Sequence, residues 1–283
     1  MIKKLRQIIP AREKPLGPGQ SVFSPLPHPD LGDTSPFLML DHFGPKKVSL
    51  NQPFHVPPHP HKGFEPVTLL FRGEVLHRDS LGNTGHLNAG DVQWMTAGSG
   101  VIHSEGVPPA FLEKGGELEL IQLWINLPAR AKSHPPRYQD LRSGQFPGIQ
   151  AGDAVLRLIA GSYGSFHSPT QLLHPVLILH GRMYNGGRSE VVIPNGYNAL
   201  VYVISGELCC DSKTAGARSL MVFGTEAAPI GIEAVDDAEF IILAGQPVHE
   251  PLASYGPFVM NTRAELIEAV EEYQSGKMGS LEE

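Results

Sequence analysis

The sequence predicts an all-β protein of short antiparallel strands, and three observations carry this prediction. Glycine and proline supply 31 and 26 of the 283 residues, well above their usual combined share of about 12%. Apolar residues nevertheless make up 41% of the chain, which is too many for a disordered polypeptide. Short alternating apolar segments also recur between turn signals, a pattern typical of antiparallel sandwiches or barrels.

Six segments are the expected strands, and turn signals such as Asn88-Ala-Gly-Asp lie between them. The strands cover residues 67–71, 117–127, 155–160, 175–179, 199–204 and 240–243. Segment 117–127 is the most informative, because one side carries Gln122, Trp124 and Asn126 while the other is almost entirely apolar. This pattern predicts a strand with one face in a core and the other lining a semi-polar cavity.

A helix is expected only near the C-terminus. Thr262-Arg-Ala-Glu265 has the pattern of a capping box, and Leu266 and Val270 follow at helical spacing before a stop signal at Gly276. We expect a short packing helix with no role in chemistry.

A weak internal repeat suggests the domain organisation. Phe71-Arg-Gly-Glu-Val75 resembles Ile204-Ser-Gly-Glu-Leu208 at an offset of 133 residues, and each segment follows an apolar strand. Two similar barrels in tandem would explain both the repeat and the length. We therefore expect one barrel over residues 1–135 and a second over 136–283, which ends in the helix.

Composition and charge limit the classes of partner. Lysine and arginine number 22 against 29 acidic residues, a net charge of −7, whereas nucleic-acid binders show a basic patch or stripe. No segment has the pattern of a signal peptide or the roughly 18 apolar residues of a membrane helix. The adjacent Cys209 and Cys210 indicate reduced thiols. We expect a cytoplasmic protein that binds neither nucleic acid directly nor membranes.

Two pairs of residues suggest a metal site: His59-Pro-His61 and His103-Ser-Glu105. In a strand, residues two apart point to the same face, so each pair presents two ligand-type side chains on one surface. If the two segments are neighbouring antiparallel strands, four ligands converge. Three imidazoles and one carboxylate suit Fe, Zn, Ni, Cu or Mn rather than Ca or Mg, and an octahedral ion would keep about two positions open.

Several nearby residues have other expected roles. Glu65 shares the parity of His59 and His61, so it is either a fourth ligand that competes with Glu105 or an acceptor that orients a histidine. Four further histidines lack a pairing and are interpreted as non-ligands: His42, His55, His77 and His86. Shifted by 133 residues, the ligand positions do not recur, so we expect metal in the N-terminal barrel alone.

Other catalytic chemistries have little support. The chain lacks a glycine-rich phosphate loop and a Gly-x-Ser-x-Gly elbow, which argues against nucleotide chemistry and serine hydrolysis. Cys209 and Cys210 have no evident histidine partner, so neither is expected to be a nucleophile.

Two long motifs closely resemble the signature of the pirins, a branch of the cupin superfamily. They are His59-Pro-His-Lys-Gly-Phe-Glu-Pro-Val-Thr68 and Gly90-Asp-Val-Gln-Trp-Met-Thr-Ala-Gly-Ser-Gly-Val-Ile-His-Ser-Glu105. Shorter matches, among them Pro36-Phe-Leu-Met-Leu-Asp41 and Gly256-Pro-Phe-Val-Met-Asn-Thr262, extend the resemblance from about residue 21 to residue 262.

The resemblance implies a bicupin: two tandem antiparallel, jelly-roll-type cupin β-barrels with one iron in the N-terminal barrel. The ligands of the family fall on His59, His61, His103 and Glu105, and the family pattern makes Glu65 a non-ligand. It also implies a monomer. Several pirins are quercetin 2,3-dioxygenases, and others act as protein partners, as co-regulators of transcription or as a modulator of a metabolic enzyme.

The first functional hypothesis is therefore an oxidoreductase, a quercetinase that takes a flavonol and O2 and releases carbon monoxide. Fe(II) is the expected cofactor, with Zn, Ni, Mn or Cu as possible substitutes. Glu105 is the expected catalytic residue, because it could accept the proton of the flavonol 3-hydroxyl. Gln122 and Trp124 are expected to line the substrate pocket, with Lys62 and Glu65 near its mouth.

The second hypothesis is a non-catalytic, iron-dependent redox sensor that binds a protein partner. A change of one charge unit at the iron would shift nearby loops and alter a recognition surface. A third class, a sugar isomerase of the kind found in other cupins, lacks an evident phosphate-binding cluster.

Overall fold

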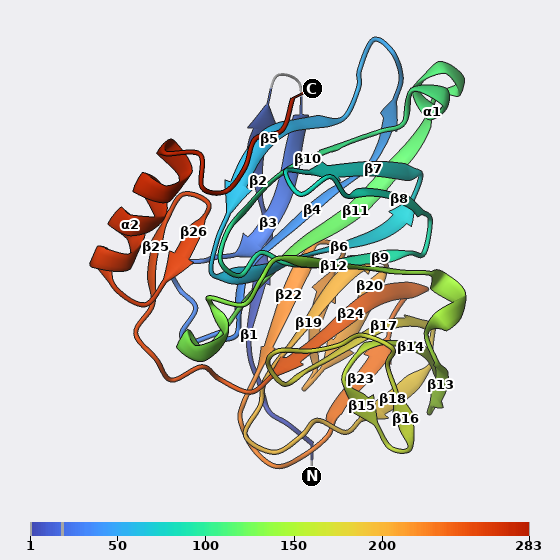
Figure 1. The fold of residues 1–283 in the computed structure, drawn as a ribbon. Helices are drawn as coiled ribbons and strands as arrows, with labels where there is room; N and C mark the ends of the chain where they lie inside the picture. The colour runs from blue at the N-terminus through green and yellow to red at the C-terminus, as the bar shows by residue number, and fades with distance from the viewer. Residues whose placement is uncertain (1, 18–19, 283) are drawn as a thin grey trace. The chain divides into compact units, whose positions relative to one another are not determined.

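The computed structural model describes residues 2–17 and 20–282 and is mostly β-strand (Figure 1). It divides into two compact units. Of the described residues, unit 1 comprises 2–13, 23–36 and 144–247, and unit 2 comprises 14–17, 20–22, 37–143 and 248–282.

Unit 2 contains a four-stranded sheet and a seven-stranded sheet, apart from residues 12–13 and 23–26 of the latter, which belong to unit 1. In spatial order, the large sheet consists of β12 (Arg137–Leu141), β9 (Val92–Thr96), β6 (Phe64–Arg72), β11 (Gly116–Asn126), β4 (Phe37–Val48), β3 (Gln20–Leu26) and β2 (Arg12–Gly17). The small sheet consists of β5 (His55–His61), β10 (Val101–Gly106), β7 (Glu74–Asp79) and β8 (Thr84–Asn88). The strand predicted over residues 117–127 is confirmed as β11, which pairs antiparallel with β4 and with β6.

An apolar core forms within unit 2 from buried side chains of both sheets: β6 and β9 are buried along almost their whole length, whereas β7 and β8 alternate buried and more exposed positions. It includes Phe43 and Phe54, whose ring centroids are 4.6 Å apart, together with Leu70, Leu87 and Leu118. Three short helical segments connect strands: α1 (Pro109–Lys114) and the 3-10 turns Ala129–Ala131 and Ser143–Gln145.

Unit 1 has the same arrangement of a large and a small sheet. The large sheet consists of β1 (Leu5–Pro10), β22 (Ser219–Phe223), β19 (Asn198–Ser205), β24 (Ala238–Gly245), β17 (Val176–Met183), β14 (Ala154–Ala160) and β13 (Gly148–Ala151). The small sheet consists of β18 (Arg188–Val191), β23 (Ile230–Ala234), β20 (Glu207–Cys210) and β21 (Lys213–Gly216). A separate hairpin pairs β15 (Ser162–Tyr163) with β16 (Phe166–His167).

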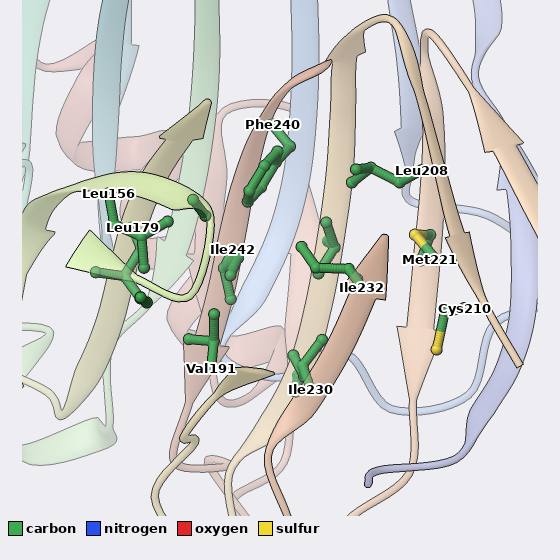
Figure 2. Packing of buried hydrophobic residues seen from close by; sticks show 14 of the residues in the cluster. Leu156, Leu179, Val191, Leu208, Cys210, Met221, Ile230, Ile232, Phe240 and Ile242 are labelled. Atoms are coloured by element: carbon green, nitrogen blue, oxygen red, sulfur yellow. The ribbon is translucent and has the colours of Figure 1, made fainter. Parts of the chain in front are cut away.

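Side chains from both sheets of unit 1 form its core (Figure 2). Leu179 on β17 and Ile242 on β24 come from the large sheet, and Ile232 on β23 comes from the small one. Cys210 is buried in this core and Cys209 is partly exposed, and both are free thiols. The six predicted strands all lie on observed ones, and the prediction of two tandem antiparallel barrels is confirmed.

The unit boundaries differ from the expected division at residues 135 and 136. Strand β1, from the N-terminus, pairs with β22 in the sheet of unit 1, and it covers the backbone groups that an edge strand would leave unpaired. The C-terminal residues from Val248 onward belong to unit 2. The N-terminal segment thus belongs to the same unit as residues 144–247, and the C-terminal segment to the same unit as residues 37–143.

The C-terminal segment forms a hairpin and the predicted helix. The hairpin pairs β25 (Ala253–Tyr255) with β26 (Phe258–Met260), and α2 (Arg263–Gln274) lies beside it (Figure 1). The predicted capping box is confirmed, because the Thr262 side chain accepts a hydrogen bond from Glu265 N and the Glu265 carboxylate accepts one from Thr262 N. The apolar face of α2 joins a cluster that contains Ile102, Phe258, Met260, Leu266, Ala269 and Met278. Among the described residues, no helix is long and apolar enough to cross a membrane.

Candidate metal centre

The four-stranded sheet of unit 2 brings the two predicted residue pairs together. Strand β10 lies between β5 and β7 and is antiparallel to both. His103 lies opposite His59, and Val101 lies opposite His61. The register shifts between His103 and Glu105, an irregularity that re-aims side chains next to functional sites. The structure thus places the pairs on neighbouring strands, as the ligand hypothesis required.

The ring nitrogens of His59, His61 and His103 form a compact cluster. One ring nitrogen of each lies within 4.8 Å of the others, and the Nε2 atoms of His59 and His103 are 2.8 Å apart. Two imidazole nitrogens bound at adjacent positions of one ion, each at about 2.0–2.1 Å, would be about 3 Å apart. The observed spacing therefore fits a single ion held by both rings.

The hydrogen bond of His59 fixes which of its nitrogens can bind a metal. Its Nδ1 lies 2.8 Å from the carbonyl oxygen of Pro57. Because a carbonyl oxygen only accepts, Nδ1 carries the proton and Nε2 presents a lone pair. Ligating histidines commonly donate their other N–H to a carbonyl in this way.

Burial keeps the imidazoles of the cluster neutral. It lowers the pKa of His61 and of His103 well below the usual value, and the neighbouring histidines lower both further. Burial also lowers the pKa of His59, although the hydrogen bond to Pro57 raises it. Since a metal binds the neutral ring, these residues are in the required state near neutral pH.

Glu105 lies beside the histidines with a polar contact of its own. The hydroxyl of Thr68 is 3.4 Å from Glu105 Oε1 and 2.8 Å from Gln122 Oε1. Burial raises the pKa of Glu105 to about 7, although the hydrogen bond from Thr68 lowers it. A carboxyl group that titrates near neutrality is suited to accept and release a proton.

A cavity of about 310 Å³ opens onto this cluster. His59, His61 and Glu105 lie in its wall, together with Gln122 and Trp124 of β11. The remaining lining is mostly apolar: Leu16, Val22, Met39, Asp41, Phe43, Phe54, Val56, Leu120 and Pro257. A mostly apolar cavity of this size with a few convergent polar groups is typical of a small-molecule site.

Trp124 connects the cavity wall to the histidine cluster. Its ring centroid is 5.2 Å from that of His61 and 4.3 Å from that of Phe64. Such aromatic contacts orient the rings in addition to burying them.

In the part of the chain that the structure describes, Glu65 lies neither among the metal-competent residues nor in a hydrogen bond that orients one of the histidines. Its Oε1 accepts a hydrogen bond of 2.7 Å from the Thr96 hydroxyl, and burial raises its pKa to about 7 although Thr96, Trp94 and Arg137 lower it. Among the described residues, neither the metal-competent groups nor the cavity wall includes Glu65. Its strand parity was read through Gly63, but β5 ends at His61 and β6 begins at Phe64.

Lys62 also differs from its expected position at the pocket mouth. Its ammonium group forms an ion pair with Glu272 on α2, and it is not among the described residues of the cavity wall. Its backbone carbonyl accepts a hydrogen bond from Val259 N. Lys62 therefore joins the strand that carries the histidines to the C-terminal segment, which itself contributes Pro257 to the cavity.

His77 is the residue of the centre that the sequence interpretation set aside. It is buried on β7, with its Nε2 2.5 Å from His103 Nδ1, and it forms a second metal-competent group with His103 and Glu105. The available signal was strand parity, because His77 and Asp79 share one buried face of β7. Among the described residues, both such groups lie in unit 2.

The fold and this cluster define the class of protein: a bicupin with a histidine- and glutamate-lined cavity that implies a bound metal. Residues 19–125 match the family model for pirin, and residues 178–279 match that for the pirin C-terminal cupin domain. The chain belongs to the pirin family.

Relatives and solved structures agree with this assignment. The chain is 37% identical to a pirin-like protein of Solanum lycopersicum over 95% of this chain and 90% of that protein. It is 33% identical to pirin of Homo sapiens over 98% and 94%, respectively. A crystal structure of quercetin 2,3-dioxygenase from Acinetobacter baumannii, 36% identical, superimposes with a TM-score of 0.94 and covers 100% of both chains.

Proposed function

We propose that this protein is a metal-dependent dioxygenase that cleaves flavonols such as quercetin. The observation that carries the proposal is the apolar cavity of about 310 Å³ whose wall contains His59, His61 and Glu105. An aromatic substrate in this cavity would contact the metal-binding groups directly. The structural similarity to a quercetin 2,3-dioxygenase supports the same reaction class.

We assign the metal ligands to His59, His61, His103 and Glu105, and the metal to iron(II). The support is the donor set, because neutral imidazoles with one carboxylate suit a divalent transition metal, and zinc, nickel, manganese or copper would bind the same atoms. When bound, the iron would stabilise the deprotonated flavonol and supply the electronic coupling to dioxygen.

The side chains of this chain would bind, orient and deprotonate the substrate. Glu105 would accept the proton of the flavonol 3-hydroxyl, and the contact with the Thr68 hydroxyl supports this role because it holds a polar partner beside the carboxylate. Trp124 and the apolar wall would hold the flat ring system and exclude water. Flavonol and O2 together contain all the atoms of the depside and the carbon monoxide released, so the reaction consumes no external reductant.

The test follows the absorbance of quercetin under air with iron-loaded protein, chelated protein and the variant His103→Ala. The expected result is rapid loss of absorbance with the iron-loaded wild type alone. The matched control is His86→Ala, since His86 is an exposed histidine of the same sheet paired with Glu74. Turnover by chelated protein, or by His103→Ala without bound iron, would contradict the proposal.

The alternative function is an iron-dependent redox sensor with a protein partner. What favours it is unit 1, a complete barrel whose described residues include no metal-competent group. The same sample decides between the two, because iron-loaded protein that leaves quercetin intact would favour the sensor. Both proposed functions, the dioxygenase and the redox sensor, include a cytoplasmic location, which the free thiols of Cys209 and Cys210 support.

A further inference from the structure

The imidazole of His103 is engaged at both ring nitrogens. Its Nε2 lies 2.8 Å from Nε2 of His59, and its Nδ1 lies 2.5 Å from Nε2 of His77. A neutral imidazole has one N–H donor and one acceptor nitrogen. The tautomer of His103 therefore decides to which neighbour it donates, and which nitrogen it can offer to a metal.

Strand register places His77 against the side of His103 that faces away from His59. On β10, His103 lies opposite His59 of β5 and opposite Asp79 of β7, while Glu105 lies opposite His77. His77 is thus the diagonal neighbour of His103, a separation that long side chains can span. The centroids of the two rings are 4.7 Å apart.

The surroundings of this pair favour a fixed hydrogen bond. His77 and His103 are each 1% exposed, so bulk water does not compete for their ring nitrogens. The ring of Tyr138 packs against His77 with a centroid distance of 4.8 Å, which restricts rotation of the imidazole.

The proton positions along this row follow once a metal is bound. His59 donates through Nδ1 to Pro57 and presents Nε2. For His103 to bind the same ion through Nε2, its proton must be on Nδ1. That N–H then points at Nε2 of His77, which must be an unprotonated acceptor, so the proton of His77 must be on its own Nδ1.

We propose that His77 is a positioning residue of the metal centre: its Nε2 accepts the Nδ1–H of His103 and holds His103 in the tautomer that presents Nε2 to the metal. This inference rests on the proposed metal site and not on the reaction catalysed there. The usual acceptor behind a ligating histidine is a carboxylate, a carbonyl or water. A neutral imidazole orients His103 without adding negative charge.

The test compares metal binding by the wild type and three variants: His77→Leu, His77→Gln and the control His86→Leu. Leucine removes the acceptor, whereas the amide oxygen of glutamine restores one. Zinc affinity is measured by competition with a chromophoric chelator, which needs no turnover. Long-range 1H–15N spectra of the zinc-loaded proteins report the tautomer and the metal-bound nitrogen of each histidine, and thermal unfolding of the metal-free proteins checks the fold.

The wild type is expected to show His103 protonated at Nδ1 and bound at Nε2, with His77 protonated at Nδ1 and free of metal. His77→Leu should bind zinc about 10–100-fold more weakly, while His77→Gln and His86→Leu stay close to the wild type. If His77→Leu does not fold, the proposal is tested by the spectra of the wild type and by the zinc affinity of His77→Gln.

Three results would overturn the inference. They are equal zinc affinity in a folded His77→Leu variant, a His77→Gln affinity as weak as that expected for His77→Leu, and a metal-bound nitrogen on His77, which would make it a ligand within the group His77, His103 and Glu105. A wild type that takes up no metal would overturn the proposed function as well. Normal uptake by the wild type with equal uptake by His77→Leu would overturn only the role of His77.

Discussion

The ammonium nitrogen of Lys132 lies 2.7 Å from the carbonyl oxygen of Gly63, two residues beyond His61. Lys132 is only 3% exposed and donates also to Asn126 Oδ1 at 2.8 Å and to Val259 O at 3.0 Å. Burial lowers its pKa to about 8, although Glu250 and Glu265 raise it. One buried lysine thus joins the corner after the histidine pair to the C-terminal hairpin.

Replacing Lys132 by methionine should destabilise unit 2. The change leaves three acceptors without their common donor, and we expect the free energy of unfolding to fall by about 2–4 kcal/mol. Urea unfolding measures this loss. The exposed Lys277 provides the control, because Lys277→Met should change stability by less than about 0.5 kcal/mol. Equal stability of Lys132→Met and the wild type would show that these hydrogen bonds are dispensable.

Gly63→Ala should disrupt the approach of the C-terminal hairpin to the histidine strand. Gly63 has φ +88°, and an added Cβ would lie 1.9 Å from Val259 O. Gly82 is the matched control, because its φ of +85° is nearly the same but no atom lies within 4 Å of an added Cβ. Both substitutions cost about 1 kcal/mol for the left-handed backbone.

Only Gly63→Ala should lower the stability further and reduce the zinc retained after dialysis. Thermal unfolding and metal analysis of both variants give the comparison. Indistinguishable behaviour of Gly63→Ala and Gly82→Ala would contradict the close contact at Val259.

Trp124→Ala should weaken flavonol binding while the metal is retained. The indole lines the cavity and packs against Phe64 and His61 without belonging to the metal-competent group. We expect KM for quercetin to rise about tenfold, the equivalent of an aromatic contact of roughly 1.4 kcal/mol. Trp124→Phe should recover most of the loss. Unchanged KM in Trp124→Ala would place the substrate elsewhere.

Lys62→Met should affect stability and not turnover. The ion pair of Lys62 with Glu272 is largely buried, with side-chain exposures of 11% and 20%, so we expect a loss of about 1–2 kcal/mol. A double-mutant cycle with Glu272→Gln isolates the pair. A large fall in kcat/KM for quercetin at unchanged stability would instead indicate that Lys62 acts at the mouth of the pocket, as expected from the sequence.

The stability of unit 1 should depend on pH through Glu239. Its Oε1 lies 2.7 Å from His180 Nε2 and 2.8 Å from Arg182 Nη2. Burial raises the pKa of Glu239, but the hydrogen bonds from His180 and Arg182 outweigh burial and lower it from 4.5 to about 2. Because the folded state binds the proton more weakly, this contribution is complete above pH 4.5 and is lost as the pH falls toward 2.

Glu239→Gln should therefore cost about 1–3 kcal/mol at pH 7 and clearly less at pH 3. The expected cost is modest because solvent around the exposed Arg182 side chain screens its attraction to Glu239. Urea unfolding of the wild type and the variant at both values measures the difference. A cost that does not change with pH would show that Glu239 acts through packing and not through its charge.

Local pattern in the sequence was enough for six of the strands, the capped helix and the two pairs of candidate ligands. Strand periodicity is a property of neighbouring residues, so His59 and His61 share a face wherever that strand is placed. The capping box at Thr262 is equally local. The long motifs around these pairs also identified the family, because they preserve the order and spacing of its signature.

Tertiary structure alone decided which distant residues complete the centre. The diagonal contact of His77 with His103 depends on the register of β7 against β10, and parity within either strand does not encode that register. The ion pair of Lys62 with Glu272 spans 210 residues of sequence. The N-terminal strand β1 finds its partner β22 only when the sheet of unit 1 has assembled, and the residues from Val248 onward belong to unit 2. These features arise from long-range pairing and from the burial of edges and apolar faces, whose partners become defined only when the whole chain has folded.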